Sequence, residues 1–231
     1  MPREAFHTSI DNVQALLIRL GGVAEEAIHK AVTSLETQNL AEARLVLDGD
    51  DVLDEMENEI EERVLRLLAL QQPLAKDLRT LSAIWKTATD FERVGDYAAN
   101  IAERTLWIGN IPLIKPLVDI PQMARSAEKM LRESLDAFVR RDIELAAQVC
   151  AADDVVDKLY ADLFEELMGF VASGDSTRSI QAVQLLFVAR YLERVADHAT
   201  NVSERVIYMV TGKQVAHEGK MYGDEIEGGK S

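Results

Sequence analysis

The chain has 231 residues, enough for one large domain or two small ones, and 48% of them are hydrophobic, so a core can be buried. Its 40 acidic and 25 basic residues give a formal net charge of −15, which argues against nucleic acid or anionic lipid as a partner. The single cysteine, Cys150, cannot form a disulfide within the chain and indicates a reducing compartment. The start lacks an apolar signal segment and no apolar run has the length of a membrane span, so a cytoplasmic protein is predicted.

The first half of the chain predicts three long helices. Apolar residues recur every three or four positions from Ile10 to Leu35, as one face of a helix requires. A second helix is predicted at about 41–70, ending before Pro73, and a third at about 75–109. Alternating β-branched runs closed by turn residues, which would indicate strands, are absent from the sequence.

The segment 109–121 holds three of the five prolines and cannot be helix interior, so we interpret it as the link between two halves. Helices are predicted beyond it at about 121–139, 142–172 and 177–211. The sequence therefore predicts an all-α fold of two tandem, similar three-helix bundles with six long helices, residues 1–110 and 111–231. The polar segment 212–231 is expected to be a flexible tail.

Two motifs occur once in each half. FERVGDYAANIAER at 91–104 returns as LERVADHATNVSER at 192–205. Aligned at a shift of 101 with their flanking residues, the two copies share eight of eighteen positions, whereas unrelated segments would share about one. DDVLD at 50–54 likewise returns as DDVVD at 153–157. Two motifs repeated in the same order indicate a duplicated unit.

The repeated motifs contain four acidic pairs, each with members four positions apart and therefore on one helix face. They are Asp50/Asp54 and Glu92/Asp96 in the first half, and Asp153/Asp157 and Glu193/Asp197 in the second. Like charges at this spacing destabilise a helix by roughly 0.2–0.5 kcal/mol per pair, so a counter-charge is expected. Arginines such as Arg93 and Arg194 are one candidate, and a metal ion is the other.

A metal site forms if consecutive antiparallel helices place the two pairs of each half opposite each other. Sites made of oxygen ligands suit hard cations, so the candidates are magnesium, calcium, manganese and iron. Asn100 and Asn201 lie one turn further along and are expected to be outer ligands or to orient the carboxylates. His198 directly follows Asp197, and both a ligand role and a structural, partly buried role stay open for it.

With these residues in view, the chain resembles the PhoU family over nearly its whole length. The resemblance rests on the repeated motifs and on PLAKDLRTL at 73–81, RYLERVADHATNVSER at 190–205 and YMVTGKQVAH at 208–217. It implies two three-helix bundles that bind metal clusters through the four acidic pairs. One departure is Tyr97, where the family often has histidine, so no ligand role is carried over to that position.

The resemblance also implies a function. PhoU proteins are cytosolic negative regulators of phosphate uptake and of the phosphate-starvation response, without known enzymatic turnover. They contact a Pst-type phosphate transporter and a membrane sensor histidine kinase, and do not insert into the membrane. A homodimer is expected here as well, and Trp85 and Trp107 are candidates for core or dimer contacts.

Two alternatives stay open on the residues alone. One is a two-metal enzyme, a hydrolase or an oxidase, in which carboxylates bridge the ions; such hydrolases also need a general base and an open cleft. The other is a purely structural helical protein whose acidic stripes are solvated. The metal content of purified protein and assays of turnover would distinguish the three.

Overall fold

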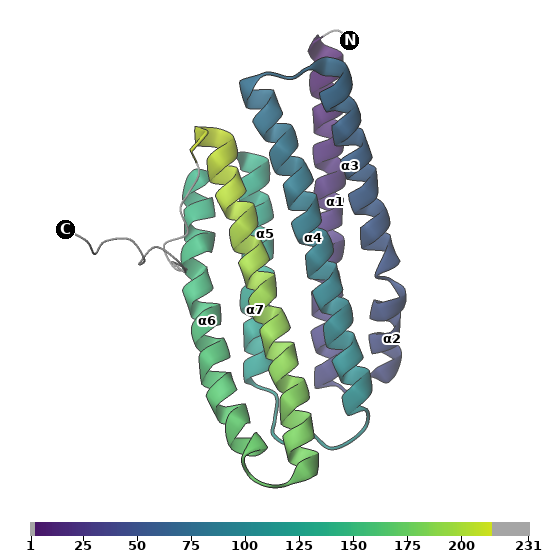
Figure 1. Cartoon of the computed structure of the whole chain (residues 1–231), viewed down its shortest axis with the longest axis vertical. Helices are drawn as coiled ribbons and strands as arrows, with labels where there is room; N and C mark the ends of the chain where they lie inside the picture. The colour runs from purple at the N-terminus through teal and green to yellow at the C-terminus, as the bar shows by residue number, and fades with distance from the viewer. Residues whose placement is uncertain (1–2, 214–231) are drawn as a thin grey trace, which may run out of the picture.

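The structure is a computed structural model, and it describes residues 3–213 as seven helical segments with no strand in that range (Figure 1). The helices are α1 (Arg3–Glu36), α2 (Leu40–Asp48), α3 (Asp51–Gln71), α4 (Ala75–Ile108), α5 (Asp119–Arg140), α6 (Ile143–Val171) and α7 (Ser176–Thr211). The predicted all-α fold of two three-helix bundles is confirmed, with α2 and α3 together in the place of one predicted helix. The predicted tail lies, beyond its first two residues, outside the described range.

The helices run side by side in one elongated molecule (Figure 1). α1 to α4 form the first bundle and α5 to α7 the second, and the bundles meet where α4 contacts α7 and α1 contacts α5. Buried apolar side chains of all seven helices make one continuous core, which includes Phe91 and Phe138. The domain boundary at residues 110 and 111 stays a prediction, since one core spans both halves.

A short turn at Gly49 and Asp50 interrupts the helix that precedes α4. The backbone N–H of Gly49 donates to the carbonyl of Val46 at 3.2 Å, and that of Asp50 donates to Leu47 at 3.4 Å. The second half has Ala152 where the first has Gly49, and α6 continues through that position. Glycine is less favourable than alanine in a helix interior by about 1 kcal/mol, which favours a break at Gly49.

The break places Asp50 at the N-cap of α3, where its side chain makes no capping hydrogen bond. Its carboxylate is therefore not used by the helix end, in contrast to Asp142, which accepts bonds from two backbone N–H groups at the start of α6.

Close packing of α3 on α4 brings the acidic pairs of the first half together. A Cβ atom added to Gly95 would lie only 2.8 Å from Cδ1 of Leu53, so glycine permits this approach. Because Leu53 precedes Asp54 and Gly95 precedes Asp96, the same contact brings the two carboxylates near each other. No helix within residues 3–213 is both long and apolar enough to cross a membrane.

Candidate metal centre

Three carboxylates from two helices converge in the first half. Asp54 lies in the first turn of α3, and Glu92 and Asp96 lie one turn apart on α4. One oxygen from each of the three lies within 4.8 Å of the others, the only such group of metal-ligating side chains in residues 3–213. Carboxylate oxygens at this separation can share one hard cation.

Asp50, the fourth predicted metal ligand of the first half, is influenced by the charges of these carboxylates. Burial raises the pKa of Asp50, and the negative charges of Asp96 and Asp54 raise it further. Burial also raises the pKa of Glu92, with a further contribution from Asp96, while Arg93 acts in the opposite direction. The first-half carboxylates thus disfavour each other's ionisation, and a cation would relieve that repulsion.

Arginine supplies part of the counter-charge. The guanidinium of Arg93 donates to Asp96 at 2.7 Å and lies 3.4 Å from Glu92. Its side chain is 56% exposed, so it lies on the solvent side of the cluster and can turn outward at little cost. One guanidinium against four carboxylates leaves room for a cation, and both candidates for the counter-charge fit the first half.

The acidic pair Glu193/Asp197 of the second half is more buried than the pair Glu92/Asp96 of the first half. Arg190 donates to one oxygen of Glu193 at 2.6 Å, and Arg194 donates to Asp197 at 3.3 Å. The Glu193 side chain is only 8% exposed, and its other oxygen, Oε2, is buried with no hydrogen-bond partner. Burial raises the pKa of Glu193, and the charges of Asp197 and Asp157 add to the effect. A buried carboxylate oxygen without a hydrogen bond is the atom that a cation would satisfy.

The remaining predicted ligands lie near these residues but less tightly. Within the described residues, Asp153 and Asp157 do not join the second-half pair in a group as compact as that of the first half. Asn100 and Asn201 are half-buried on α4 and α7. Their ligand roles stay predictions.

His198 contacts the first half across the interface of α4 and α7. Its Nδ1 lies 2.8 Å from Oδ1 of Asp90 on α4. The guanidinium of Arg205 pairs with the same Asp90 and donates to the carbonyl of Lys86 at 2.7 Å. These contacts join α4 to α7, and we call Asp90, His198 and Arg205 the seam cluster. Desolvation by burial lowers the pKa of the His198 imidazole.

Asp90 is not among the predicted site residues, although the sequence carries a signal for it. Asp90 falls in a row with Ala83, Thr87, Val94, Ala98 and Ile101, which recur every three to four positions and are all buried. A charged residue in such a row requires a partner, because a buried unpaired charge is costly. Tyr97, at the position equivalent to His198, also lies at the contact between α4 and α7, where its ring stacks on Tyr191 with centroids 5.9 Å apart.

Comparison with known proteins agrees with this architecture. The family model described as the PhoU domain matches residues 17–105 and 120–206. The chain belongs to the PhoU family. Each matched segment contains both acidic pairs of its half, so the duplication inferred from the motifs coincides with two PhoU domains.

PhoU relatives match over most of their length. The chain is 39% identical to a phosphate-specific transport system accessory protein PhoU homolog of Clostridium acetobutylicum, covering 93% of this chain and 98% of the relative. It is 41% identical to a protein of the same description from Aquifex aeolicus, covering 90% and 94%. The crystal structure of PhoU from Pseudomonas aeruginosa superposes with a TM-score of 0.85 at 34% identity, covering 90% of this chain and 100% of that one.

Proposed function

We propose that this protein is a regulatory accessory subunit of phosphate uptake. The observation that carries the proposal is the match along more than nine-tenths of the chain to relatives described as accessory proteins of a phosphate-specific transport system. The absence of a membrane-spanning helix from residues 3–213 is compatible with action on the transporter from the cytosol. In this role the protein restrains uptake and acts as an adaptor between a Pst-type transporter and a sensor histidine kinase.

The carboxylate clusters supply the second part of the proposal. Asp50, Asp54, Glu92 and Asp96 hold a cation in the first half, and Asp153, Asp157, Glu193 and Asp197 hold one in the second. The donor set consists of carboxylates, which suits iron, manganese, magnesium or calcium. Bound cations offset the burial and the charge repulsion that raise the pKa values of Glu92 and Glu193, and thereby stiffen the contacts of α3 with α4 and of α6 with α7.

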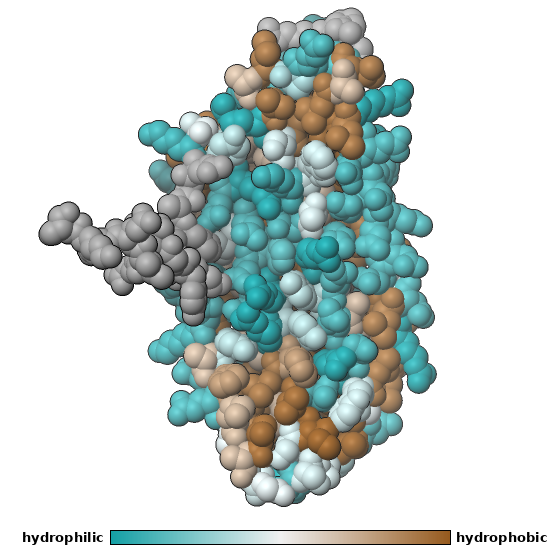
Figure 2. Space-filling view, in the orientation of Figure 1, coloured by the Kyte–Doolittle hydropathy of each residue, from teal (hydrophilic) through white to brown (hydrophobic). Residues whose placement is uncertain are grey.

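A two-metal enzyme would need a general base in addition to these carboxylates, whereas a non-enzymatic role needs no such group. An adaptor needs exposed surface for partners, and Figure 2 shows a hydrophilic belt between hydrophobic areas on the face formed by α4 and α7. We propose that the hydrophobic area at the lower end, around Trp107, Ile111 and Ile180, also takes part in a homodimer. These three side chains are each about half exposed, and they border a cavity of about 240 Å³.

The test of the regulatory role is deletion of the gene in the native cell. Uptake of labelled phosphate should rise, and a starvation-controlled reporter should become active in phosphate-replete medium. Complementation with the wild-type chain should restore both. Normal uptake and normal signalling without the protein would contradict the assignment. Purified protein should release no phosphate from p-nitrophenyl phosphate with or without metal, whereas turnover would favour a two-metal hydrolase.

The test of the metal role is the metal content and melting temperature of Asp96→Asn/Asp197→Asn. This variant keeps the side-chain shapes but removes one carboxylate from each cluster. We expect it to lose bound metal in elemental analysis and to lose the rise in melting temperature that metal gives the wild type, because a ligand that binds only the folded state stabilises it. Asp11→Asn/Asp136→Asn, which removes two exposed charges elsewhere, is the matched control and should behave like the wild type.

If arginines alone neutralise the stripes, the wild type will not respond to chelator or to added metal. That result would remove the metal sites and leave the proposed regulatory role intact.

A further inference from the structure

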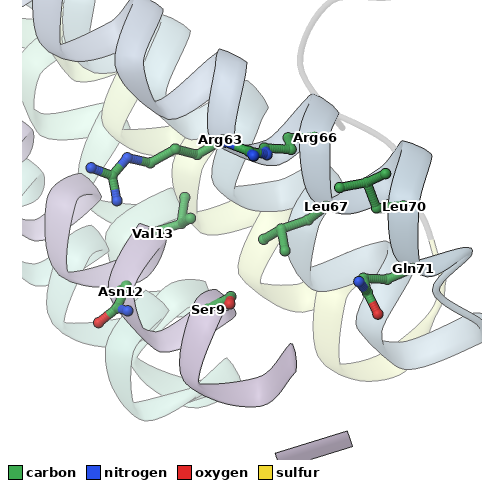
Figure 3. Close-up of a pocket in the computed structure, with 8 residues that line it drawn as sticks. All are labelled: Ser9, Asn12, Val13, Arg63, Arg66, Leu67, Leu70 and Gln71. Carbon is green, nitrogen blue, oxygen red and sulfur yellow. The ribbon is translucent and has the colours of Figure 1, made fainter. Parts of the chain in front are cut away.

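A cavity of about 330 Å³ lies between α1 and α3, outside the acidic clusters (Figure 3). Its volume is at the lower end of the range for small-molecule sites, roughly 300–1,000 Å³. Val13 on α1 and Leu67 on α3 point toward each other across it, and Arg63 extends from α3 toward α1 (Figure 3). The lining side chains used below are Asn12, Val13, Arg63, Arg66, Leu67 and Leu70.

The lining combines positive charge with apolar surface. Arg63 and Arg66 are the charged members, and the lining contains no carboxylate. Arg63 is paired only along its own helix, with Glu59 at 2.5 Å, and both side chains of this pair are about half exposed. Arg66 forms no ion pair with any carboxylate of residues 3–213.

The second half provides an internal comparison. The motifs at 50–54 and 153–157 align these helices with a difference of 103 in residue number, and the matched PhoU segments begin at 17 and 120 with the same difference. At this register Arg63 corresponds to Glu166. Lys115 lies 103 residues after Asn12, but it belongs to the link before α5, whereas Asn12 lies within α1. Lys115 forms ion pairs with Glu166 and with Asp119, so the equivalent position of the second half is closed by its own side chains.

The first half thus has a cation, Arg63, where its copy has an anion, Glu166. Arg63 cannot be neutralised from α1, because Asn12 and its neighbours in the lining carry no charge. The component missing from the first half is a negative group between α1 and α3. A bound anion would supply such a group.

From this comparison we propose that the α1–α3 cavity binds a small organic anion with a carboxylate or phosphate head and a short aliphatic body. The head pairs with the guanidinium groups of Arg63 and Arg66, which match planar or tetrahedral oxyanions with paired N–H donors. The amide of Asn12 adds a further donor. The aliphatic body lies on Val13, Leu67 and Leu70, of which Leu70 is 66% exposed and would lose water contact on binding.

The experiment is a titration of the full-length protein with hexanoate, followed by the chemical shifts of its backbone amides. 1-Hexanol has the body without the charge, and acetate has the charge without the body. Hexanoate should shift amides of residues 9–13 and 63–71 saturably, and the other two should bind at least about tenfold more weakly, since a charged hydrogen bond contributes roughly that factor. Hexyl phosphate in a parallel titration shows which head group is preferred.

Three variants locate the site. Arg63→Gln/Arg66→Gln should weaken hexanoate binding by about tenfold or more, whereas Arg44→Gln/Arg140→Gln, which removes two exposed arginines outside the cavity, should not. Asn12→Lys/Arg63→Glu transfers the ion pair of the second half into the first, and should abolish hexanoate binding while keeping the helical content. All substituted positions are exposed, so folding is expected to be retained.

Equal affinity for hexanoate and 1-hexanol would overturn the proposal, because the arginines would then have no part in binding. Unchanged hexanoate affinity in Arg63→Gln/Arg66→Gln, or no saturable shift in the wild type, would overturn it as well. None of these residues belongs to the acidic clusters, so either outcome leaves the proposed regulatory role unaffected.

Discussion

Two adjacent glycines in α1 have opposite surroundings. A Cβ atom on Gly21 would lie 2.9 Å from Leu135 and 3.2 Å from the ring of Phe91, whereas a Cβ atom on Gly22 would meet nothing within 4 Å. Gly21 therefore allows α1 to approach α4 and α5, while Gly22 only makes the helix less stable. Substitutions at these two positions therefore test two effects of glycine separately: close packing at Gly21 and reduced helix stability at Gly22.

We expect Gly22→Ala to raise the free energy of unfolding by about 0.5–1 kcal/mol, because alanine is the better helix former. Gly21→Ala should lower it by about 1 kcal/mol or more, since overpacking against Phe91 costs more than the helix gains. Denaturant unfolding of both variants and the wild type measures the two changes. Stabilisation by both substitutions would show that α1 does not pack closely at Gly21.

Glu128 on α5 is a carboxylate whose environment opposes ionisation. Its side chain is 13% exposed and lies 3.3 Å from the imidazole of His29 on α1. Burial raises the pKa of Glu128 above its ordinary value of 4.5, and His29 only partly offsets the effect. Between the two pKa values the folded state binds more protons than the unfolded state. The stability contributed by protonated Glu128 is therefore lost as the pH rises from 4.5 through the folded pKa.

Glu128→Gln should keep that stability at neutral pH. We expect the variant to exceed the wild type by up to about 1 kcal/mol at pH 7, after allowance for solvent screening, and to show no advantage near pH 4. Unfolding measured across this pH range gives the comparison. Glu36→Gln, at an exposed position near the end of α1, is the control, and an equal gain from it would point to net charge as the cause.

At the scale of elements, α4 and α7 depend on the seam cluster. Asp90 is 5% exposed, and it binds both His198 and Arg205 across the contact between the halves. Burial lowers the pKa of Arg205 to about 10, which still leaves the guanidinium charged at neutral pH. The buried charges of Asp90 and Arg205 therefore stabilise each other.

Asp90→Ala should lower the free energy of unfolding by about 3 kcal/mol, because it leaves Arg205 buried without its counter-charge. Asp90→Asn/Arg205→Met should recover much of the loss, since the double variant buries no charge. Equilibrium unfolding of Asp90→Asn, of Arg205→Met and of the double variant, compared with the wild type, forms a double-mutant cycle. Additive losses would show that the pair is not coupled.

The helices themselves were predictable from sequence because apolar periodicity and proline positions determine them. The predicted span of 75–109 agrees with α4 (Ala75–Ile108), and the proline-rich link lies between α4 and α5 as expected. The interruption at Gly49 was not predicted, because one glycine in a periodic pattern is compatible with either a break or a continuous helix. The fold follows from the periodic pattern of many residues, whereas the break depends on a single glycine, whose effect that pattern does not decide.

The candidate site was predictable only in part. The spacing of Glu92 and Asp96 showed that they share a helix face, and the structure brings Asp54 to them. The depth of Glu193 and the direction of His198 were not predictable, because both depend on which neighbouring helix covers each face of α7. Asp90 was missed for the same reason: its partners are 108 residues away or more in the sequence.

At the scale of the whole molecule, the proposed homodimer uses the hydrophobic area around Trp107. Trp107 is 54% exposed at the end of α4, next to the half-exposed Ile111 and Ile180. A charged residue in this area would oppose dimerisation without disturbing the core, because the side chain is not packed inside the chain. Trp85, the other tryptophan, packs against the core and is less suited to a contact between copies.

Trp107→Glu should convert a dimer into a monomer in light scattering coupled to size-exclusion chromatography, with little change in melting temperature. Leu45→Glu is the matched control, since Leu45 is 71% exposed on α2, away from this area. A wild type that is monomeric at all accessible concentrations would rule out the proposed homodimer. A Trp107→Glu variant that remains dimeric would place the interface elsewhere.

The antiparallel contact of α4 and α7 indicates how a chain with two similar halves could have arisen. Arg104 meets Gln184, Asp90 meets His198 and Arg79 meets the carbonyl of Met209, so positions rising along one helix meet positions falling along the other. Two equivalent helices crossing in this manner are related as the subunits of a twofold-symmetric dimer are. An ancestor with one half could have closed the same surface by pairing with its own copy. The link between α4 and α5 then replaced a concentration-dependent association with a permanent one. After that the two copies could diverge, and the second half now has Ala152, Glu166 and His198 at the positions that correspond to Gly49, Arg63 and Tyr97.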